Sequence, residues 1–180
     1  MDTSNDSFSI LINIANNLLP VQELLSGAAY VMGIGFAMKA LMSLKSHGEN
    51  RQGMSQGASP LKEPALYLVV AAMMIYFPTA VDIMLNTSFG SPNILSYQQL
   101  PDNVMTYLNG NSSLGRALVV IIQTIGLYAF VRGWVLVARS GGSGSQPGGL
   151  GKGLTHVFGG VLAINIVGTL EMIDNTLFGT

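Results

Sequence analysis

The chain has 180 residues and no cysteine, and charged side chains occupy only 9% of its positions. Ordinary soluble domains carry about 25% charged residues, so this composition excludes a well-hydrated globular surface and favours a membrane-embedded or tightly assembled protein. The missing cysteines exclude disulfides and thiolate metal sites. A formal charge of −1 provides no electrostatic reason to expect nucleic-acid binding.

The first predicted element is a short amphipathic helix that ends at Pro20. Apolar residues recur at helical spacing from Phe8 to Leu19, and proline interrupts the hydrogen bonding of a helix. Such a helix lies on a membrane surface, packs on a neighbouring subunit or folds back on its own bundle. The sequence leaves these three alternatives open.

Four stretches poor in charge follow, at 24–38, 64–81, 117–131 and 157–170. Each is shorter than the roughly 20 residues that a spanning helix needs, but flanking residues extend it. Lys and Arg side chains at the ends of such helices reach back to the membrane surface. We therefore expect an all-α protein with four long helices.

Basic residues gather around the loops after the first and third of these helices. They are Lys39, Lys45, Arg51, Lys62, Arg132, Arg139 and Lys152, which make up seven of the eight basic residues. Seven of the nine acidic residues lie elsewhere in the chain. The positive-inside rule then places both loops in the cytoplasm and both termini on the other side.

These loops are also the candidate binding site. Cations at a membrane boundary, beside glycines that expose backbone N–H groups, suit the phosphates of anionic lipids. The residues expected to meet lipid head groups or to line a lumen are Lys45, Arg51, Lys62, Arg139 and Lys152. An anionic phospholipid such as phosphatidylglycerol would then be a structural ligand. The alternative is that these cations only set the topology.

Small residues in the apolar stretches predict close helix packing, because association in an apolar solvent depends on close backbone approach. The glycines expected at such contacts are Gly33, Gly35, Gly159, Gly160 and Gly168. The packing partner is either another helix of the same chain or another copy of the protein.

The chain also contains an internal repeat. Asn86–Gly90 reads NTSFG, and Asn175–Gly179 reads NTLFG 89 positions later. The matching positions upstream are Gly33 with Gly126 and Lys39 with Arg132 at an offset of 93, and Ile75 with Ile164 and Asp82 with Glu171 at an offset of 89. The repeat predicts two tandem hairpins in the same orientation. Residues 1–90 hold the amphipathic arm and the first hairpin, and residues 91–180 hold a connector and the second.

The sequence contains no catalytic constellation, and we expect no enzymatic activity. His47 and His156 have no carboxylate cluster at metal-ligand spacing, so no metal site is expected. The glycine-rich stretch at 140–153 fails the phosphate-loop pattern, because Gln146 replaces a required glycine and Gly153 follows Lys152. No organic cofactor is expected either.

The stretch SQPGGLGKGLTHVFGGVLAINIVGTLEMIDNTLFG, at 145–179, resembles the small hydrophobic IcmC/DotE and IcmD/DotP proteins of Dot/Icm type IVB secretion systems. Their conjugative-plasmid counterparts are TraQ and TraR, and the length and end motif favour a TraQ-like protein. The match rests on the Pro-Gly-Gly loop, the Gly-Lys-Gly-Leu-x-His segment and the Asn-Ile-x-Gly-Thr segment; elsewhere it is mostly hydropathy. The resemblance implies a component of an apparatus that transfers DNA or effector proteins.

A hairpin of two apolar helices with a basic cytoplasmic loop also resembles the major pilins of conjugative and type IVA systems. This resemblance implies a subunit that starts in the bacterial inner membrane and self-assembles into a helical channel or an extracellular pilus. The implied partners are copies of itself, phospholipid, other type IVB secretion components, and transported DNA or protein without sequence-specific contact.

Two alternative functions remain open. One is a structural subunit of the same apparatus that stays in the inner membrane and does not polymerise. The other is a small solute or ion transporter with parallel repeats, which needs polar groups at mid-membrane. Asn165 and Gln123 are the polar residues that this transporter would use.

Overall fold

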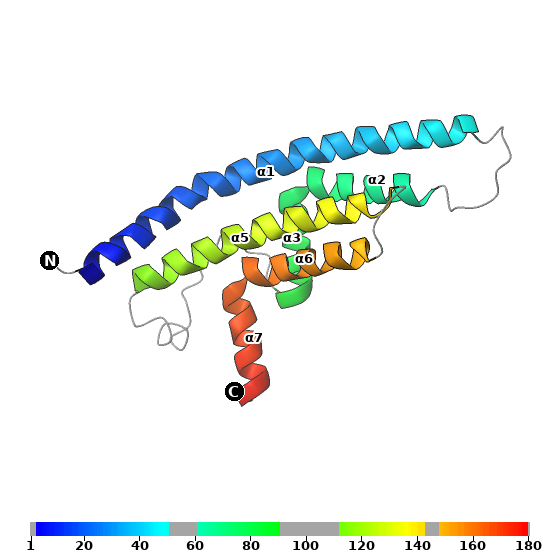
Figure 1. The fold of residues 1–180 in the computed structure, drawn as a ribbon. Helices are drawn as coiled ribbons and strands as arrows, with labels where there is room; N and C mark the ends of the chain where they lie inside the picture. The colour runs from blue at the N-terminus through cyan, green and yellow to red at the C-terminus, as the bar shows by residue number, and fades with distance from the viewer. Residues whose placement is uncertain (1–2, 51–60, 91–111, 143–147, 180) are drawn as a thin grey trace. The chain divides into compact units, whose positions relative to one another are not determined.

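The computed structural model describes residues 3–50, 61–90, 112–142 and 148–179. Within these ranges the chain forms six α-helices and no strand, which confirms the all-α class (Figure 1). The helices are α1 (Thr3–Asn50), α2 (Lys62–Ile75), α3 (Phe77–Phe89), α5 (Ser112–Arg139), α6 (Gly149–Ile164) and α7 (Ile166–Phe178).

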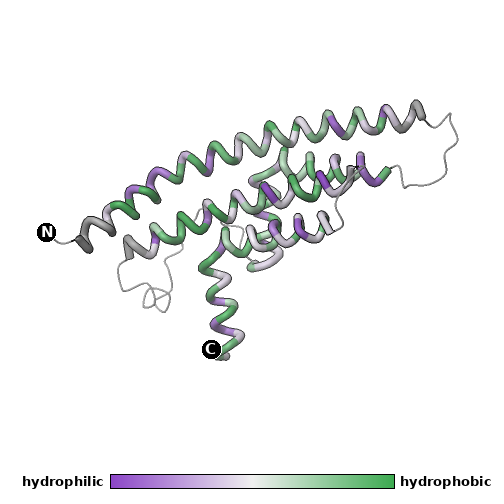
Figure 2. Tube along the Cα trace, viewed as in Figure 1, coloured by the Kyte–Doolittle hydropathy of each residue, from purple (hydrophilic) through white to green (hydrophobic). Residues whose placement is uncertain are grey.

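Two of these helices are long and apolar enough to cross a membrane. The qualifying segments are Ser9–Ser46 in α1 and Gly115–Arg139 in α5, and apolar residues recur along both in Figure 2. The 14 residues of α2 and the 16 of α6 extend only about 21 and 24 Å, less than the roughly 30 Å of a bilayer core. The described residues therefore hold two candidate spans, or up to four if each bent pair of helices is one span.

The prediction of a separate N-terminal helix is wrong, because α1 continues through Pro20 to Asn50. An interior proline costs a helix about 3 kcal/mol, since it has no N–H and its ring crowds the carbonyl four residues earlier. Packing on both sides of the proline opposes this cost. Ala15 and Gln22 are both buried, and they lie seven residues apart on one helix face. The side chain of Gln22 donates a hydrogen bond to the hydroxyl of Thr124 in α5, at 2.9 Å.

The prediction of four long helices is also corrected, because the second and the fourth are broken. The axis turns by 92° between α2 and α3, and by 91° between α6 and α7. The breaks fall at Tyr76 (φ −96°, ψ 37°) and at Asn165 (φ −109°, ψ 60°). These two positions are 89 residues apart, the same offset that separates the two NTxFG motifs.

Different side chains stabilise the two breaks. Pro78 is the second residue of α3 and has no N–H with which to continue the hydrogen bonding of α2. In the second half, the side-chain oxygen of Asn165 accepts a hydrogen bond from the N–H of Gly168 at 3.2 Å, as an N-cap. The hydroxyl of Thr169 lies 2.8 Å from the carbonyl oxygen of Leu162 and satisfies a group that the break has released.

The same glycine contact precedes each break. A Cβ atom on Gly33 would lie 2.8 Å from the backbone nitrogen of Ile75, and one on Gly126 would lie 2.8 Å from the backbone nitrogen of Ile164. These pairs are equivalent in the repeat. In both halves, only a residue without a side chain lets the first helix come this close to the backbone of the second.

The NTxFG motif is a helix C-terminal cap in both halves. Gly90 and Gly179 have φ values of 70° and 66°, in the left-handed region that glycine enters without steric cost. Their N–H groups donate to the carbonyls of Asn86 and Asn175 at 2.9 and 3.1 Å. The threonine hydroxyl of each motif donates to the carbonyl four residues earlier at 2.7 Å. The repeated letters therefore encode a shared helix end.

Tertiary contacts divide the chain into two compact units, each with segments from both halves of the repeat. One unit comprises Met1–Leu25, Val81–Tyr128 and Gly159–Thr180, and the other comprises Ser26–Ala80 and Ala129–Phe158. In the first unit, Gln22 bonds to Thr124 across the halves. In the second, the rings of Phe77 and Phe130 meet edge to face with centroids 5.8 Å apart. The halves are therefore joined by packing within each unit.

Alanine at either contact glycine should destabilise the protein. We expect Gly33→Ala and Gly126→Ala each to lower the free energy of unfolding by about 1–3 kcal/mol, because the new methyl group overlaps backbone atoms. Denaturation by SDS in detergent micelles, followed by circular dichroism, measures the change.

Gly35→Ala is the matched control, since a Cβ there meets no atom within 4 Å among the described residues. Alanine is a better helix former than glycine by about 1 kcal/mol, so this variant should be as stable as the wild type or more so. Equal losses at positions 33 and 35 would contradict the proposed contact.

Candidate functional site

The described basic residues of the two loop regions all belong to the unit formed by Ser26–Ala80 and Ala129–Phe158. They are Lys39, Lys45, Lys62, Arg132, Arg139 and Lys152, and each side chain is exposed. The remaining predicted residue, Arg51, lies outside the described residues. By sequence this unit holds seven basic and two acidic residues, a formal charge of +5. The two basic regions thus form one positively charged unit.

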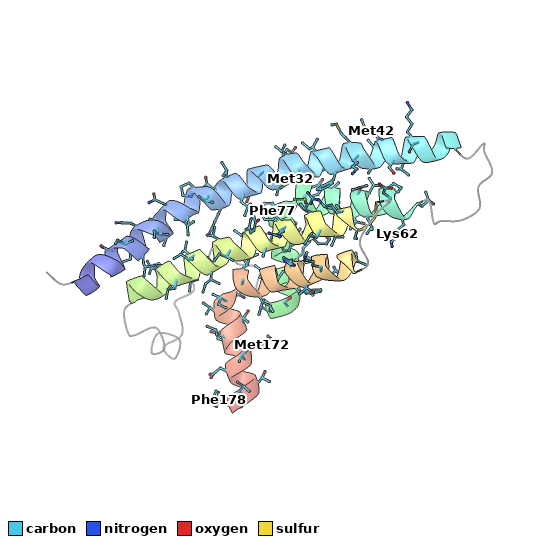
Figure 3. The ribbon with its side chains drawn as sticks, viewed as in Figure 1. Met32, Met42, Lys62, Phe77, Met172 and Phe178 are labelled. Carbon is cyan, nitrogen blue, oxygen red and sulfur yellow. The ribbon has the colours of Figure 1, made fainter. Side chains whose placement is uncertain are left out.

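A turn after α5 brings the ends of the two basic regions together. A Cβ on Gly141 would lie 2.9 Å from the side chain of Leu66 and 3.3 Å from the Cα atom of Glu63. Arg139 lies two residues before this glycine, and Lys62 immediately precedes Glu63 at the start of α2 (Figure 3). Lys62 and Arg139 are therefore each within two residues of the contact between Glu63 and Gly141.

The start of α6 adjoins the same turn. A Cβ on Gly149 would lie 3.4 Å from the Cβ of Ser140. Lys152 follows three residues later, in the first turn of the helix. Three cations from three segments (Lys62, Arg139 and Lys152) are thus tied to one backbone junction, which we call the basic junction.

One described carboxylate lies at the basic junction: Oε1 of Glu63 would be 3.6 Å from a Cβ on Gly142. Glu63 is the only acidic residue of this unit whose side chain the structure describes, and no ion pair joins it to Lys62, Arg139 or Lys152 in the described ranges. Among the described residues, one carboxylate for three cations leaves the basic junction with a net positive charge. This is the arrangement that a phosphate-bearing ligand would recognise.

Lys39 has a different environment. Its ammonium group lies 4.6 Å from the ring centroid of Tyr67, in cation–π geometry. Phe36 stacks on the same ring at 6.0 Å. Tyr67 is buried in α2, so the contact joins α1 to α2 and leaves Lys39 a structural role.

The structure divides the predicted packing glycines into three groups. Gly33 contacts α2, and the carbonyl oxygen of Gly160 lies 2.9 Å from where a Cβ on Gly126 would be. Gly168 contacts only the side chain of Asn165 within its own cap. At Gly35 and Gly159, an added Cβ would have no described atom within 4 Å.

Gly133 and Gly153, which also join α5 to α6, were not predicted as packing glycines from the sequence. A Cβ on Gly133 would lie 2.9 Å from the carbonyl oxygen of Gly153, and a Cβ on Gly153 would lie 3.0 Å from that of Gly133. The available signal was spacing: Gly126 and Gly133 are seven residues apart on α5, and Gly153 and Gly160 are seven apart on α6. Seven residues bring a side chain back to nearly the same helix face.

The polar residues considered for transport or metal binding have local roles in the structure. The side chain of Asn165 caps α7, and Gln123 is half-buried on α5. Nδ1 of His156 lies 2.9 Å from the carbonyl oxygen of Lys152, one helical turn earlier. Within the described ranges, no group of three histidine or carboxylate side chains is placed to hold a metal ion.

Removal of the cap should destabilise the second break. We expect Asn165→Ala to cost about 1 kcal/mol, because the N–H of Gly168 loses its acceptor, whereas Asn165→Ser keeps an uncharged acceptor and most of the stability. SDS denaturation of the two variants measures the difference. Equal stability of both variants and the wild type would show that the side chain does not hold the break.

Comparison of the chain with protein-family models, with curated proteins and with solved structures finds no match. The resemblance to type IVB secretion proteins therefore stays a prediction.

Proposed function

We propose that this protein is a self-assembling, membrane-inserted subunit that polymerises into the pilus or channel of a type IVB-like conjugation or secretion apparatus. The observation that carries the proposal is a duplicated set of local features: the same glycine contact, the same helix break and the same glycine cap occur in each half of the sequence. A hairpin with a basic turn is also the pilin-like pattern in the sequence, here present twice.

The apolar surface of the single chain supports assembly in or from a membrane. In the most apolar window of α1, only 17% of the residues are buried, against 33% in α5. Exposed side chains on α1 include Leu24, Val31 and Met42. Monomeric soluble proteins rarely leave so large an apolar surface in water, so lipid or neighbouring subunits cover it.

The basic junction supports a role for anionic lipid. A conduit lined with unneutralised lysines and arginines would bind transported DNA strongly and hold it. Phospholipid phosphates at Lys62, Arg139 and Lys152 would cancel that field. This is a physical reason for the assembly to carry lipid, and it applies whether the transported polymer is DNA or an acidic protein.

The transporter alternative is weaker. It depends on Asn165 as a polar group at mid-membrane, and this side chain already caps α7. The non-polymerising alternative shares the fold and the membrane insertion. Recovery of the protein from filaments or from the inner membrane distinguishes the two functions.

Filaments sheared from donor cells should contain this chain as a major component. Electron microscopy shows the filaments, and mass spectrometry of the purified material identifies their protein. Recovery of the chain only from inner-membrane fractions, with filaments made of another protein, would favour the non-polymerising subunit.

Neutralising the basic junction should weaken anionic-lipid binding. Each cation near an anionic surface contributes about 1 kcal/mol, so the triple variant Lys62→Gln, Arg139→Gln, Lys152→Gln should lose about 3 kcal/mol. The measurement is the amount of phosphatidylglycerol retained by the purified protein, relative to phosphatidylethanolamine.

Arg116→Gln is the control, because Arg116 is the one basic residue outside the two loop regions. This change should leave the lipid ratio close to that of the wild type. An unchanged ratio in the triple variant would mean that the junction does not hold lipid.

A further inference from the structure

One helix face is more deeply buried in the first half of the chain than in the second, although its members Met84 and Ile166 are both half-buried. The repeat matches Phe77, Val81 and Met84 of α3 with Ile166, Leu170 and Ile173 of α7. Phe77 and Val81 are 2% and 0% exposed, whereas Leu170 and Ile173 are 41% and 45% exposed. Helical spacing places Ile166, Leu170, Ile173 and Leu177 on one face, which we call the α7 face.

A second pair of matched faces shows the opposite asymmetry. The repeat matches five residues of α1 with five of α5: Val31, Ile34, Ala37, Met38 and Leu41 with Thr124, Leu127, Phe130, Val131 and Trp134. The residues of α5 are 0–9% exposed, whereas the four large residues of α1 are 41–68% exposed. We call the set on α1 the α1 face.

One residue from each of the two buried faces supplies a contact that joins α3 to α5 within the chain. Phe77 from α3 meets Phe130 from α5, with ring centroids 5.8 Å apart. Their equivalents are Ile166 on the α7 face and Ala37 on the α1 face. Both equivalents are half-buried, but they lie on faces whose other large residues are mostly exposed. The chain therefore carries one internal α3–α5 contact and leaves the equivalent faces largely uncovered elsewhere.

We propose that the α7 face of one chain docks on the α1 face of a second copy and repeats the internal contact between α3 and α5. This inference rests on the proposed self-assembly and names its interface. The contact is heterologous, because two different surfaces meet, so each bound chain leaves one of each face free. Such contacts generate rings or open helical filaments instead of closed dimers.

The apolar character of both faces fits a second copy of the chain as the docking partner. Every residue of the two faces is apolar, and none carries a charge. One neighbouring position departs from the repeat: Asp174 stands in α7 where α3 has the buried residue Leu85. It lies about 80° around the helix from Ile166, at the edge of the α7 face, where a polar rim is normal for an interface.

The absence of cysteine from the sequence permits a direct test. Two differently tagged chains, one with Ala37→Cys and one with Ile166→Cys, are co-expressed and treated in membranes with a short bis-maleimide crosslinker. We expect a crosslinked product that carries both tags. Neither single variant should crosslink when expressed by itself, because a heterologous contact does not bring a residue near its own copy.

Glu171→Cys replaces Ile166→Cys in the control. Glu171 is exposed on the same helix but lies about 140° around it from Ile166, so the product with Ala37→Cys should be lost. The second pair, Met38→Cys with Ile173→Cys, joins the same two faces and tests the contact if the first pair disturbs folding.

The outcomes separate this interface from the proposed function. A two-tag product from either facing pair, absent with Glu171→Cys, supports the interface. Self-crosslinking of Ala37→Cys alone would indicate α1 packed on α1 and would overturn it. Filaments that contain both variants but give no product from either pair would also overturn it, and would leave polymerisation intact. A membrane protein that forms no filaments and no product would overturn both.

Discussion

The close approach of two glycines to the backbone of a neighbouring helix sets the geometry of this protein. Gly33 and Gly126 each occupy a position where a Cβ would lie 2.8 Å from a backbone nitrogen. In both cases that nitrogen belongs to the residue just before a helix break. The van der Waals attraction between two closely packed helix backbones is short-ranged, so a single methyl group that pushes the helices apart removes it. The hairpin depends on this contact because it holds the last full turn of α2 or α6 against the preceding long helix.

The rest of each half follows from that contact. After this contact the helix axis turns by about 90°, between α2 and α3 and again between α6 and α7. The helix that follows each turn has 13 residues and ends in the same glycine cap. A pair of such hairpins in one chain matches the design of repeat proteins, in which one supersecondary unit is used again and neighbouring units cover each other. The outermost units of such an array have faces that nothing in the same chain covers. Here the exposed apolar faces are on α1 and α7, where the proposed self-assembly would use them.

Charge placement supports the same interpretation. Six exposed cations lie in one compact unit, and the three at the basic junction have no described carboxylate partner. The proposed subunit contacts and the proposed lipid site are compatible, because hydrophobic packing would order the subunits while a bound anion would remove the repulsion between their charges.

Composition and periodicity alone predicted the all-helical class, and they located the sequence repeat, the basic residues and the shared NTxFG motif. These depend on short-range effects: helical periodicity, composition, and a glycine cap with its hydrogen bonds four residues away. Three features are visible only in the folded chain: α1 passes through Pro20, the helices break at Tyr76 and Asn165, and Gly133 and Gly153 pack on a neighbouring helix while Gly35 and Gly159 meet no described atom. The breaks also have local causes, in Pro78 and in the Asn165 cap, but the passage through Pro20 and the glycine contacts depend on atoms from different helices. Gln22 and Thr124, for example, are 102 residues apart, and no local pattern around Pro20 reports their hydrogen bond.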